Sequence, residues 1–382
     1  MTGFGESHNP KKKSRAKKKI NMSQKKLFAK ASKSYSQGNI LESARYYKKL
    51  LDIGFTDPNI FNNYGSICKQ MGQTEQAIRL YRQSIQLYPK FANSHYNLGN
   101  ALRDQGKLEE AEVSTRKAIE LNPNFVDAHF NLGGILIDLG KLKEAEVATR
   151  KAIKLDPNSA ISHSNLGLIL KDQGKLEEAE VATRKAIELN PNFVDAYSIL
   201  GNIFRSQGKL EEAEISSRKV IELNPNFANA NLSLGNILRD QGKLKEAEVS
   251  TRKEIKLNPN SANANLNLGG ILRDQGKLEE AEVATRKEIK LNPNNASAYS
   301  NLGGILRDQG KLEEAETSAR KAIKLNPNFV NAHANLGNIL RDQGKLEEAM
   351  LCTKKIMSIR SWSILGSYCF NYHLKSNSFH NS

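Results

Sequence analysis

The chain has 382 residues, of which 38% are apolar and 26% charged, and its formal net charge is +16 at pH 7. Its three cysteines, Cys68, Cys352 and Cys369, are too few and too scattered for a disulfide framework or a zinc site. No run of about 18 apolar residues occurs, and no apolar segment follows the basic amino-terminal run, which argues against a membrane-spanning helix and a signal peptide. We therefore expect a soluble, cytoplasmic protein without a metal or other cofactor.

The positive charge is concentrated near the two ends of the sequence. Residues 1–30 contain ten basic residues and one acid, and residues 350–382 contain four basic residues and no acid, which leaves residues 31–349 with a net charge of +3. This nearly neutral body lacks the basic face of a nucleic-acid-binding fold. Residues 1–24 are predicted to be a basic disordered arm. Residues 11–19 (KKKSRAKKK) are expected either to solubilise the chain or to bind an anionic partner weakly, RNA or a membrane surface.

From residue 58 onward the sequence repeats with a period of 34 residues. Nine repeats cover residues 58–363, and residues 25–57 are predicted to be a degenerate first repeat with three inserted residues. Proline recurs once per repeat, usually within Leu-Asn-Pro-Asn, at Pro89, Pro123, Pro157, Pro191, Pro225, Pro259, Pro293 and Pro327. Glycine recurs twice per repeat, in one series from Gly65 to Gly337 and in a second from Gly72 to Gly344.

Each repeat is predicted to be a hairpin of two helices. In residues 126–159, apolar residues follow helical spacing on both sides of Gly140. Glycine adopts positive φ without cost and ends the first helix there, while Pro157 cannot continue the second. Gly133 lies inside the first helix, where glycine costs about 1 kcal/mol relative to alanine. Its recurrence predicts a close approach of two helices at this position.

These repeats resemble the tetratricopeptide repeat (TPR) family, whose signature consists of an aromatic residue, Leu-Gly, an apolar residue, Ala and Pro. One repeat has Tyr299, Leu302-Gly303, Leu306, Ala315 and Pro327 at these places. The resemblance implies an all-α, right-handed superhelical solenoid of helix-turn-helix repeats with a concave face. It also implies a protein that binds proteins or peptides.

Asparagine precedes the Leu-Gly pair in most repeats. The series is interrupted by Ile199 and Ser233, and its candidate peptide-binding members are Asn97, Asn131, Asn165, Asn267, Asn301 and Asn335. It resembles the asparagine ladder in the TPR superhelix of O-linked N-acetylglucosamine transferases, which implies that these side chains hold the backbone of a bound peptide. An amide has both donors and an acceptor, and so matches the N–H and C=O groups of an extended chain.

A basic residue followed by Asp recurs six residues after the asparagine position. The basic members are Arg103, Lys171, Arg239, Arg273, Arg307 and Arg341. One interpretation is a polar groove wall that accepts acidic and basic ligand side chains. The other is a solvated face of exposed ion pairs, each worth about 0–1 kcal/mol. On the second helix, Glu112 and Arg116 are predicted to form an exposed pair within one helix.

The sequence contains no GxxxxGK[ST], HExxH or GxSxG motif and no pair of carboxylates that occurs only once, and we expect no enzyme activity. His95, His129, His163 and His333 share a repeat position with aromatic residues, which predicts packing rather than metal binding. We therefore predict a non-enzymatic scaffold for extended peptides. The alternative, taken from the domains that similar bacterial arrays carry, is the substrate-recruiting arm of a protein glycosyltransferase or sulfotransferase system with its catalytic domain in another chain.

Two further expectations concern the later repeats. Glu254 and Glu288 stand where other repeats have Ala, so residues 228–295 are predicted to be the least stable stretch. Residues 364–382 are predicted to be a tail, either a capping helix or the remnant of another domain. As a cap, the segment from Trp362 would pack through Leu365, Cys369 and Tyr372.

Overall fold

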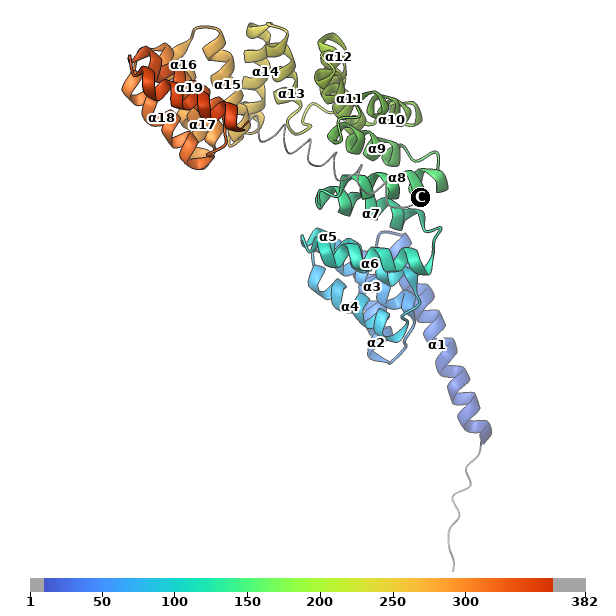
Figure 1. Ribbon diagram of the computed structural model, residues 1–382. Coiled ribbons are helices and arrows are strands. Elements are labelled where there is room, and N and C mark those ends of the chain that lie inside the picture. The colour runs from blue at the N-terminus through green and yellow to red at the C-terminus, as the bar shows by residue number, and fades with distance from the viewer. Residues whose placement is uncertain (1–9, 360–382) are drawn as a thin grey trace, which may run out of the picture. The chain divides into compact units, whose positions relative to one another are not determined.

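The structure, a computed structural model, describes residues 10–359, with side chains described from Ser23 onward. This part of the chain is all-α and contains no strand, as predicted (Figure 1). It divides into an amino-terminal half, residues 1–193, and a carboxy-terminal half, residues 194–382, which are described separately. The predicted tail at residues 364–382 lies outside the described residues.

The amino-terminal half is a row of helical hairpins in which each first helix is followed by its antiparallel second helix (Figure 1). Its helices are α1 (Pro10–Ser36), α2 (Ile40–Asp52), α3 (Pro58–Gln70), α4 (Thr74–Leu87), α5 (Ala92–Asp104), α6 (Leu108–Leu121), α7 (Val126–Asp138), α8 (Leu142–Leu155), α9 (Ala160–Asp172) and α10 (Leu176–Leu189).

The carboxy-terminal half continues the same pattern and ends in a helical segment at residues 346–359. Its helices are α11 (Val194–Ser206), α12 (Leu210–Leu223), α13 (Ala230–Asp240), α14 (Leu244–Leu257), α15 (Ala262–Asp274), α16 (Leu278–Leu291), α17 (Ala296–Asp308), α18 (Leu312–Leu325) and α19 (Val330–Asp342). In both halves the hairpins pack on their neighbours, which is the solenoid arrangement of TPR proteins.

The amino-terminal arm differs from its prediction. Residues 1–24 were expected to be disordered from their charge, but α1 begins at Pro10, and residues 1–9 lie outside the described part. The segment from Lys11 to Gln37 contains no glycine or proline, and ten of its residues are Lys, which favours helix. Helix propensity therefore outweighs the repulsion of like charges along this segment.

The turn inside each hairpin forms as predicted. Gly140 has a φ of 70°, and the N–H of Lys141 donates to the carbonyl of Leu136 at 2.8 Å, which closes the end of α7. The predicted close approach of the two helices is also confirmed, because a Cβ on Gly133 would lie 2.5 Å from Oγ1 of Thr149 on α8. Glycine therefore allows the two helices of a repeat to pack closely.

The core is a layer of small and aliphatic side chains that continues from one repeat to the next. Leu136 is 1% exposed and Ala145 is 0% exposed, and both pack with Ile169 of the following repeat. The buried threonine of the second helix, such as Thr183, donates its hydroxyl to the carbonyl one turn earlier at 2.7 Å. A repeat therefore buries its apolar side chains only when its neighbour is present.

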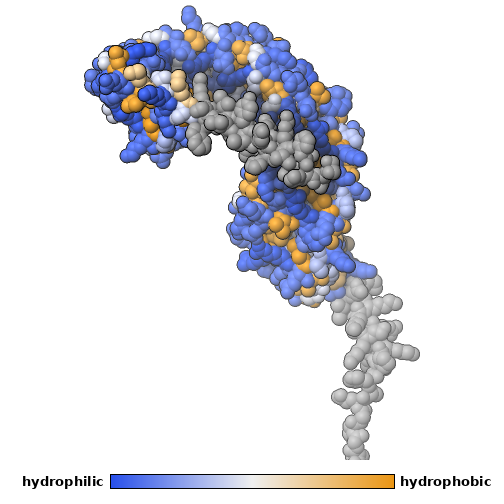
Figure 2. Space-filling view, viewed as in Figure 1, coloured by the Kyte–Doolittle hydropathy of each residue, from blue (hydrophilic) through white to orange (hydrophobic). Residues whose placement is uncertain are grey.

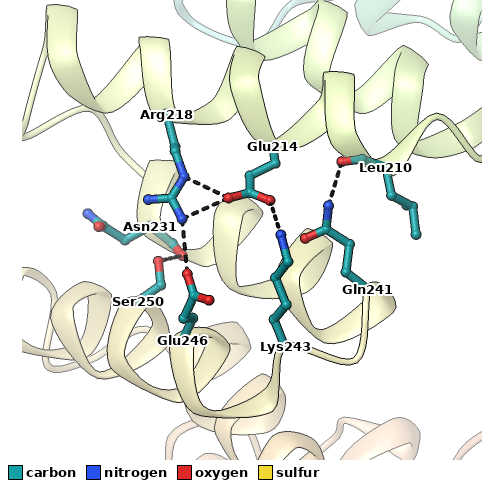
Figure 3. A network of polar contacts seen from close by, with 8 residues as sticks. All are labelled: Leu210, Glu214, Arg218, Asn231, Gln241, Lys243, Glu246 and Ser250. Carbon is teal, nitrogen blue, oxygen red and sulfur yellow. Dashed lines mark hydrogen bonds and ion pairs between the residues drawn. The ribbon is translucent and has the colours of Figure 1, made fainter.

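Charged side chains on the second helices join successive repeats (Figure 3). Glu214 accepts hydrogen bonds from Lys243 of the next repeat at 2.7 Å and from Arg218 of its own helix at 2.8 Å. Arg218 also pairs with Glu246 at 3.1 Å. The hydrogen bond from Lys243 is the main reason why the pKa of Glu214 is lowered. The predicted pair of Glu112 with Arg116 exists at 2.8 Å, but Glu112 is only 9% exposed and also accepts a hydrogen bond from Lys141 of the next repeat, so the pair is part of a network between repeats and not an exposed pair.

The network recurs along both halves and affects the same glutamate of each repeat. Hydrogen bonds from the equivalent Lys and Arg lower the pKa of Glu112 and Glu146 in the amino-terminal half. The Lys277 and Lys345 ammonium groups lower the pKa of Glu248 and of Glu316 to about 2. Because their pKa values are lowered, these carboxylates are ionised in the folded chain at all physiological pH values.

Residues 228–295 contain several features that other repeats lack. Asn229 has a φ of 61°, and α13 has 11 residues where α15 has 13. Glu254 and Glu288 are 3% and 0% exposed, and one carboxyl oxygen of each has no hydrogen-bond partner in the described chain. A buried polar atom without a partner is unfavourable. The reduced stability of this stretch stays a prediction.

Candidate functional site

The asparagine series lies on the first helices and forms one run in each half of the chain. Asn97, Asn131 and Asn165 lie on α5, α7 and α9, and successive first helices contact each other. The second run is formed by Asn267 on α15, Asn301 on α17 and Asn335 on α19. Ile199 on α11 and Ser233 on α13 precede this second run within the carboxy-terminal half.

Two of these asparagines bond to the preceding first helix. The Nδ2 group of Asn97 donates to Oδ1 of Asn62 at 2.9 Å. The Nδ2 group of Asn335 donates to the carbonyl of Ser300 at 3.0 Å and to its Oγ at 2.9 Å. Both asparagines are half-buried, and the Oδ1 atom of each accepts no hydrogen bond within the described part of the chain. These amides connect neighbouring repeats, a role that the sequence did not reveal.

Two others are largely buried. Asn131 is 4% exposed and donates to Oγ1 of Thr115 at 3.4 Å. Asn267 is 7% exposed and donates to Oγ1 of Thr251 at 3.3 Å. Both bonds reach the second helix of the preceding repeat. These two side chains are therefore less accessible to a ligand than the regular series suggests.

The remaining two are Asn165 and Asn301. Both are half-buried, and neither side-chain amide makes a hydrogen bond within the described part of the chain. The side chain of each therefore keeps its donors and its acceptor available, on a first helix whose position is fixed by packing against the neighbouring repeats. One such asparagine lies in each half of the chain, on α9 and on α17.

The series of basic residues and aspartates forms bridges from one repeat to the next. Arg103 Nε donates to Asp138 Oδ2 at 2.7 Å, a residue 35 positions later, and not to the adjacent Asp104. The guanidinium of Arg103 packs against Gly134 on α7, the first helix of the next repeat, because a Cβ on Gly134 would lie 2.5 Å from its Nη1. The same bridge is made in the carboxy-terminal half by Arg239 to Asp274, Arg273 to Asp308 and Arg307 to Asp342.

Two members of the series depart from this arrangement. Lys171 pairs with the adjacent Asp172 at 2.9 Å. Arg341 lies 3.9 Å from its own Asp342, and its side chain is 61% exposed. Sequence reasoning missed Arg205, which has no aspartate beside it but bonds to Asp240 at 2.5 Å. The sequence did contain a signal for Arg205, because it stands six residues after Ile199, which occupies the asparagine position of this repeat.

The hollows in each half lie on the opposite side of the first helices from the asparagine positions. One of about 690 Å³ is lined by Leu132, Leu136 and His129, with Val147 on its rim at 71% exposure. A similar hollow of about 680 Å³ follows one repeat later, and hollows of about 580 and 550 Å³ lie in the carboxy-terminal half. The face of the molecule seen in Figure 2 is mostly hydrophilic, with small separate apolar patches.

The repeated histidines are packing residues, as predicted. His129 is 8% exposed, and its Nε2 lies 2.9 Å from the carbonyl oxygen of Pro123, which makes Nε2 the protonated nitrogen. His95 and His333 make the same bond to Pro89 and Pro327. Within residues described with side chains, no group of three potential metal ligands occurs. None of the described helices is long and apolar enough to span a membrane.

Comparison with solved structures shows the same fold elsewhere. Yeast Tom70 is 15% identical, with a TM-score of 0.50, and the match covers 94% of this chain and 96% of that one. YrrB, described as a TPR protein with an unusual peptide-binding site, is 26% identical over 48% of this chain and 95% of its own, with a TM-score of 0.39. MamA is 26% identical over 43% of this chain and 96% of its own, with a TM-score of 0.40.

Comparison with protein families gives a consistent result, although no curated protein matches the sequence. Tetratricopeptide-repeat families match residues 262–295, 285–317, 303–344 and 330–361. The family described as the cilia and flagella-associated protein 70 C-terminal domain matches residues 9–266, more than half of the chain. The chain is therefore a tetratricopeptide-repeat protein and belongs to the family of the cilia and flagella-associated protein 70 C-terminal domain.

Proposed function

We propose that this protein is a non-enzymatic scaffold that binds extended peptide segments along its first helices. The observation that carries the proposal is the pair of half-buried asparagine amides, Asn165 and Asn301, that have no hydrogen-bond partner within the described chain. Both side chains reach solvent, so their unpaired amide donors and acceptors can bind the backbone C=O and N–H groups of a ligand. The TPR fold supports the proposal, because its proteins serve as interaction scaffolds.

Neighbouring asparagines extend this contact along each half. Asn97 and Asn335 each use an amide hydrogen internally and retain a carbonyl oxygen that can accept from a peptide. The largely buried Asn131 and Asn267 contribute to packing rather than to binding. We therefore expect two short contact regions, one centred on α9 and one on α17, in place of the single continuous series that the sequence suggests.

The charged residues are expected to add little selectivity. The bridging arginines are already paired with aspartates of the next repeat, and surface pairs of this kind are worth about 0–1 kcal/mol. Arg341 is the exception, because its side chain is 61% exposed and its nearest carboxylate oxygen is 3.9 Å away. An acidic residue of the ligand is expected to bind at this end of the second region.

The experiment compares the proteins captured by the wild-type chain with those captured by the Asn165→Ala, Asn301→Ala double variant. The matched control is Val147→Ala, which changes an exposed side chain on the second helix α8. Far-UV circular dichroism checks that all three proteins are equally helical. Partners lost only from the double variant, followed by titration with peptides of those partners, would support the proposal. Their identity would distinguish a scaffold from the recruiting arm of a glycosyltransferase or sulfotransferase.

Identical partners for all three proteins would contradict the proposal. Binding would then be sought on α1. That helix has 27 residues against 13 in its partner α2, and its sequence contains 11 Lys and Arg and no acid. A weak anionic partner of α1, such as RNA, would be recognised by binding that falls steeply with added salt and is lost when residues 1–24 are deleted.

A further inference from the structure

Two of the hollows in the carboxy-terminal half lie on either side of the second helix α14. The first, of about 580 Å³, is lined by Leu234 and Leu238 of α13, and the second, of about 550 Å³, is lined by Leu268 and Leu272 of α15. None of these four leucines is more than 5% exposed, so they form an apolar floor. Residues of α14 line both hollows, and this helix is therefore the wall between them.

Both hollows have an asparagine at a repeat position where another repeat of the same half has an aromatic ring. Asn231 and Asn265 stand at this position, and Tyr299 stands there on α17. The Nζ group of Lys321 lies 5.9 Å from the centroid of the Tyr299 ring. The lysine equivalent to Lys321 lines each of the two hollows, where the chain supplies no ring at this position. An aromatic side chain of a partner can take the place of the missing ring.

The charges around the two hollows favour an acidic partner. Four lysines line the hollows without an ion-pair partner in the described part of the chain, namely Lys245, Lys253, Lys256 and Lys287. Among the carboxylates that line them, Glu222, Glu246 and Glu280 are already paired with basic residues. Glu279 is the one carboxylate there without such a pair. Unpaired positive charge therefore prevails, and acidic residues beside the aromatic side chains of a partner would complement it.

We propose that these two hollows bind an acidic helix of a partner protein, which inserts one aromatic side chain into each hollow. Helices packed side by side lie about 8–10 Å apart, and seven residues of a helix span about 10.5 Å. Aromatic residues seven positions apart would therefore reach both sides of α14 and cover Val249 and Val283, which are each 70% exposed beside the hollows. The helix α1 of a second copy does not fit this description, because its sequence has no acid.

The probe for this proposal is a fluorescein-labelled peptide of Ala and Glu with two Phe residues seven positions apart, stapled because short helices are marginal in water. Fluorescence anisotropy measures its binding to the full-length chain. We expect saturable binding that becomes about tenfold weaker or more when both Phe residues are replaced by Ala. The Asn231→Tyr, Asn265→Tyr double variant should weaken binding to a similar extent, because it supplies the missing ring in each hollow. Tyrosine stands at this position at Tyr197 and Tyr299, so the variant should fold, which circular dichroism checks.

The matched control is the His129→Tyr, His163→Tyr double variant, which changes the same repeat position in the amino-terminal half, where a ring is already present. It should bind the peptide as the wild type does. Asn165→Ala, Asn301→Ala should also bind it normally, because this site uses none of the asparagines proposed to hold an extended peptide.

The proposal would be overturned by the absence of saturable binding to the wild type. Equal affinity for the peptide without Phe would overturn it too, as would equal affinity of the wild type and the Asn231→Tyr, Asn265→Tyr variant, or an equal loss in the control. Analytical ultracentrifugation of the chain alone tests the other occupant. Self-association that the Asn231→Tyr, Asn265→Tyr variant abolishes would assign the hollows to a second copy of the chain and would refute the proposal.

Discussion

Replacing Glu288 by alanine is expected to stabilise the carboxy-terminal half. Glu288 lies on α16 at the place where α18 has Ala322, and it is 0% exposed. Its Oε1 accepts a hydrogen bond from Nδ2 of Asn295 at 2.7 Å, and its Oε2 has no partner in the described chain. Burial raises the pKa of this carboxyl group. The folded chain therefore disfavours the ionised form, which the unfolded chain keeps in water.

The size of the effect follows from opposing contributions. Leaving a buried polar oxygen unpaired costs about 1–3 kcal/mol, and a charged group costs more. Alanine at position 288 would relieve this cost but would lose the hydrogen bond from Asn295, worth about 1 kcal/mol, and one buried methylene, worth about 0.8 kcal/mol. With about 3 kcal/mol for the carboxyl, the net stabilisation is about 1 kcal/mol at neutral pH.

Hydrogen exchange of the amides in α16 and α17 is a suitable measurement, because a repeat array need not unfold in one step. A stabilisation of about 1 kcal/mol corresponds to exchange that is about fivefold slower at pH 7. A group whose pKa is raised by folding penalises the folded chain above that pKa and not below its ordinary value. The advantage of alanine should therefore shrink as the pH falls and become a net loss below about 4.3, where the cost of ionisation is gone but the hydrogen bond and the methylene are still missing.

Two variants serve as controls for this experiment. Glu279→Ala removes an exposed carboxylate of the same helix and should change exchange little. Ala322→Glu places the carboxylate into a repeat that has alanine and should speed exchange in α18. Faster exchange in Glu288→Ala, or a gain that does not depend on pH, would refute the reasoning.

Three other substitutions test the remaining contacts. Gly303→Ala should destabilise α17 by about 1–3 kcal/mol, because a Cβ there would lie 3.1 Å from the carbonyl oxygen of Ala315. Gly337→Ala should be tolerated, because the atom nearest to its Cβ would be a side-chain carbon at 3.4 Å. Glu248→Gln should weaken the fold at pH 7 but not near pH 2: the pKa of Glu248 is lowered to about 2, so its contribution is full above about 4.3 and lost as the pH falls through 2. Arg273→Ala should loosen α15 from α17 by about 0.2–1 kcal/mol, because its bridge to Asp308 is 2.6 Å long.

Hydrogen exchange and thermal unfolding measure all three effects, and each has its own control. Equal losses for Gly303→Ala and Gly337→Ala would contradict the role of the close helix approach. Glu279→Gln, at an exposed carboxylate of α16, should leave the pH dependence unchanged. Arg341→Ala should have no effect on stability, because Arg341 bridges to no later repeat in the described chain. A similar loss from Arg341→Ala and Arg273→Ala would show that the bridges are not what stabilises the contact.

Much of the local structure could be predicted from the sequence. The 34-residue period, the turn glycine and the proline after the second helix fix hairpins that recur along both halves, and Gly133 indicated the close approach of two helices. These predictions succeeded because caps, turns and close contacts depend on residues within one repeat. The prediction of a disordered arm at residues 1–24 was wrong from Pro10 onward, where α1 begins, because the prediction gave the charge more weight than the helix propensity.

The candidate site was predicted less well. The sequence placed the asparagines at one position of the first helix, but it did not show that Asn131 is buried against Thr115 while Asn165 keeps its amide available. Identical residues at identical positions thus have different environments. The difference arises from the neighbouring repeat, which supplies or withholds the hydrogen-bond partner.

The repeat sequence by itself therefore determined the helices, their turns and the faces that meet. Only the tertiary structure decided the partners, as when Arg103 pairs with Asp138 and not with the adjacent Asp104. Adjacent residues on a helix point about 100° apart, whereas stacking brings residue 138 of the next first helix beside the guanidinium. The physical reason is that the contacts between repeats depend on how the hairpins stack, and no single repeat contains that information.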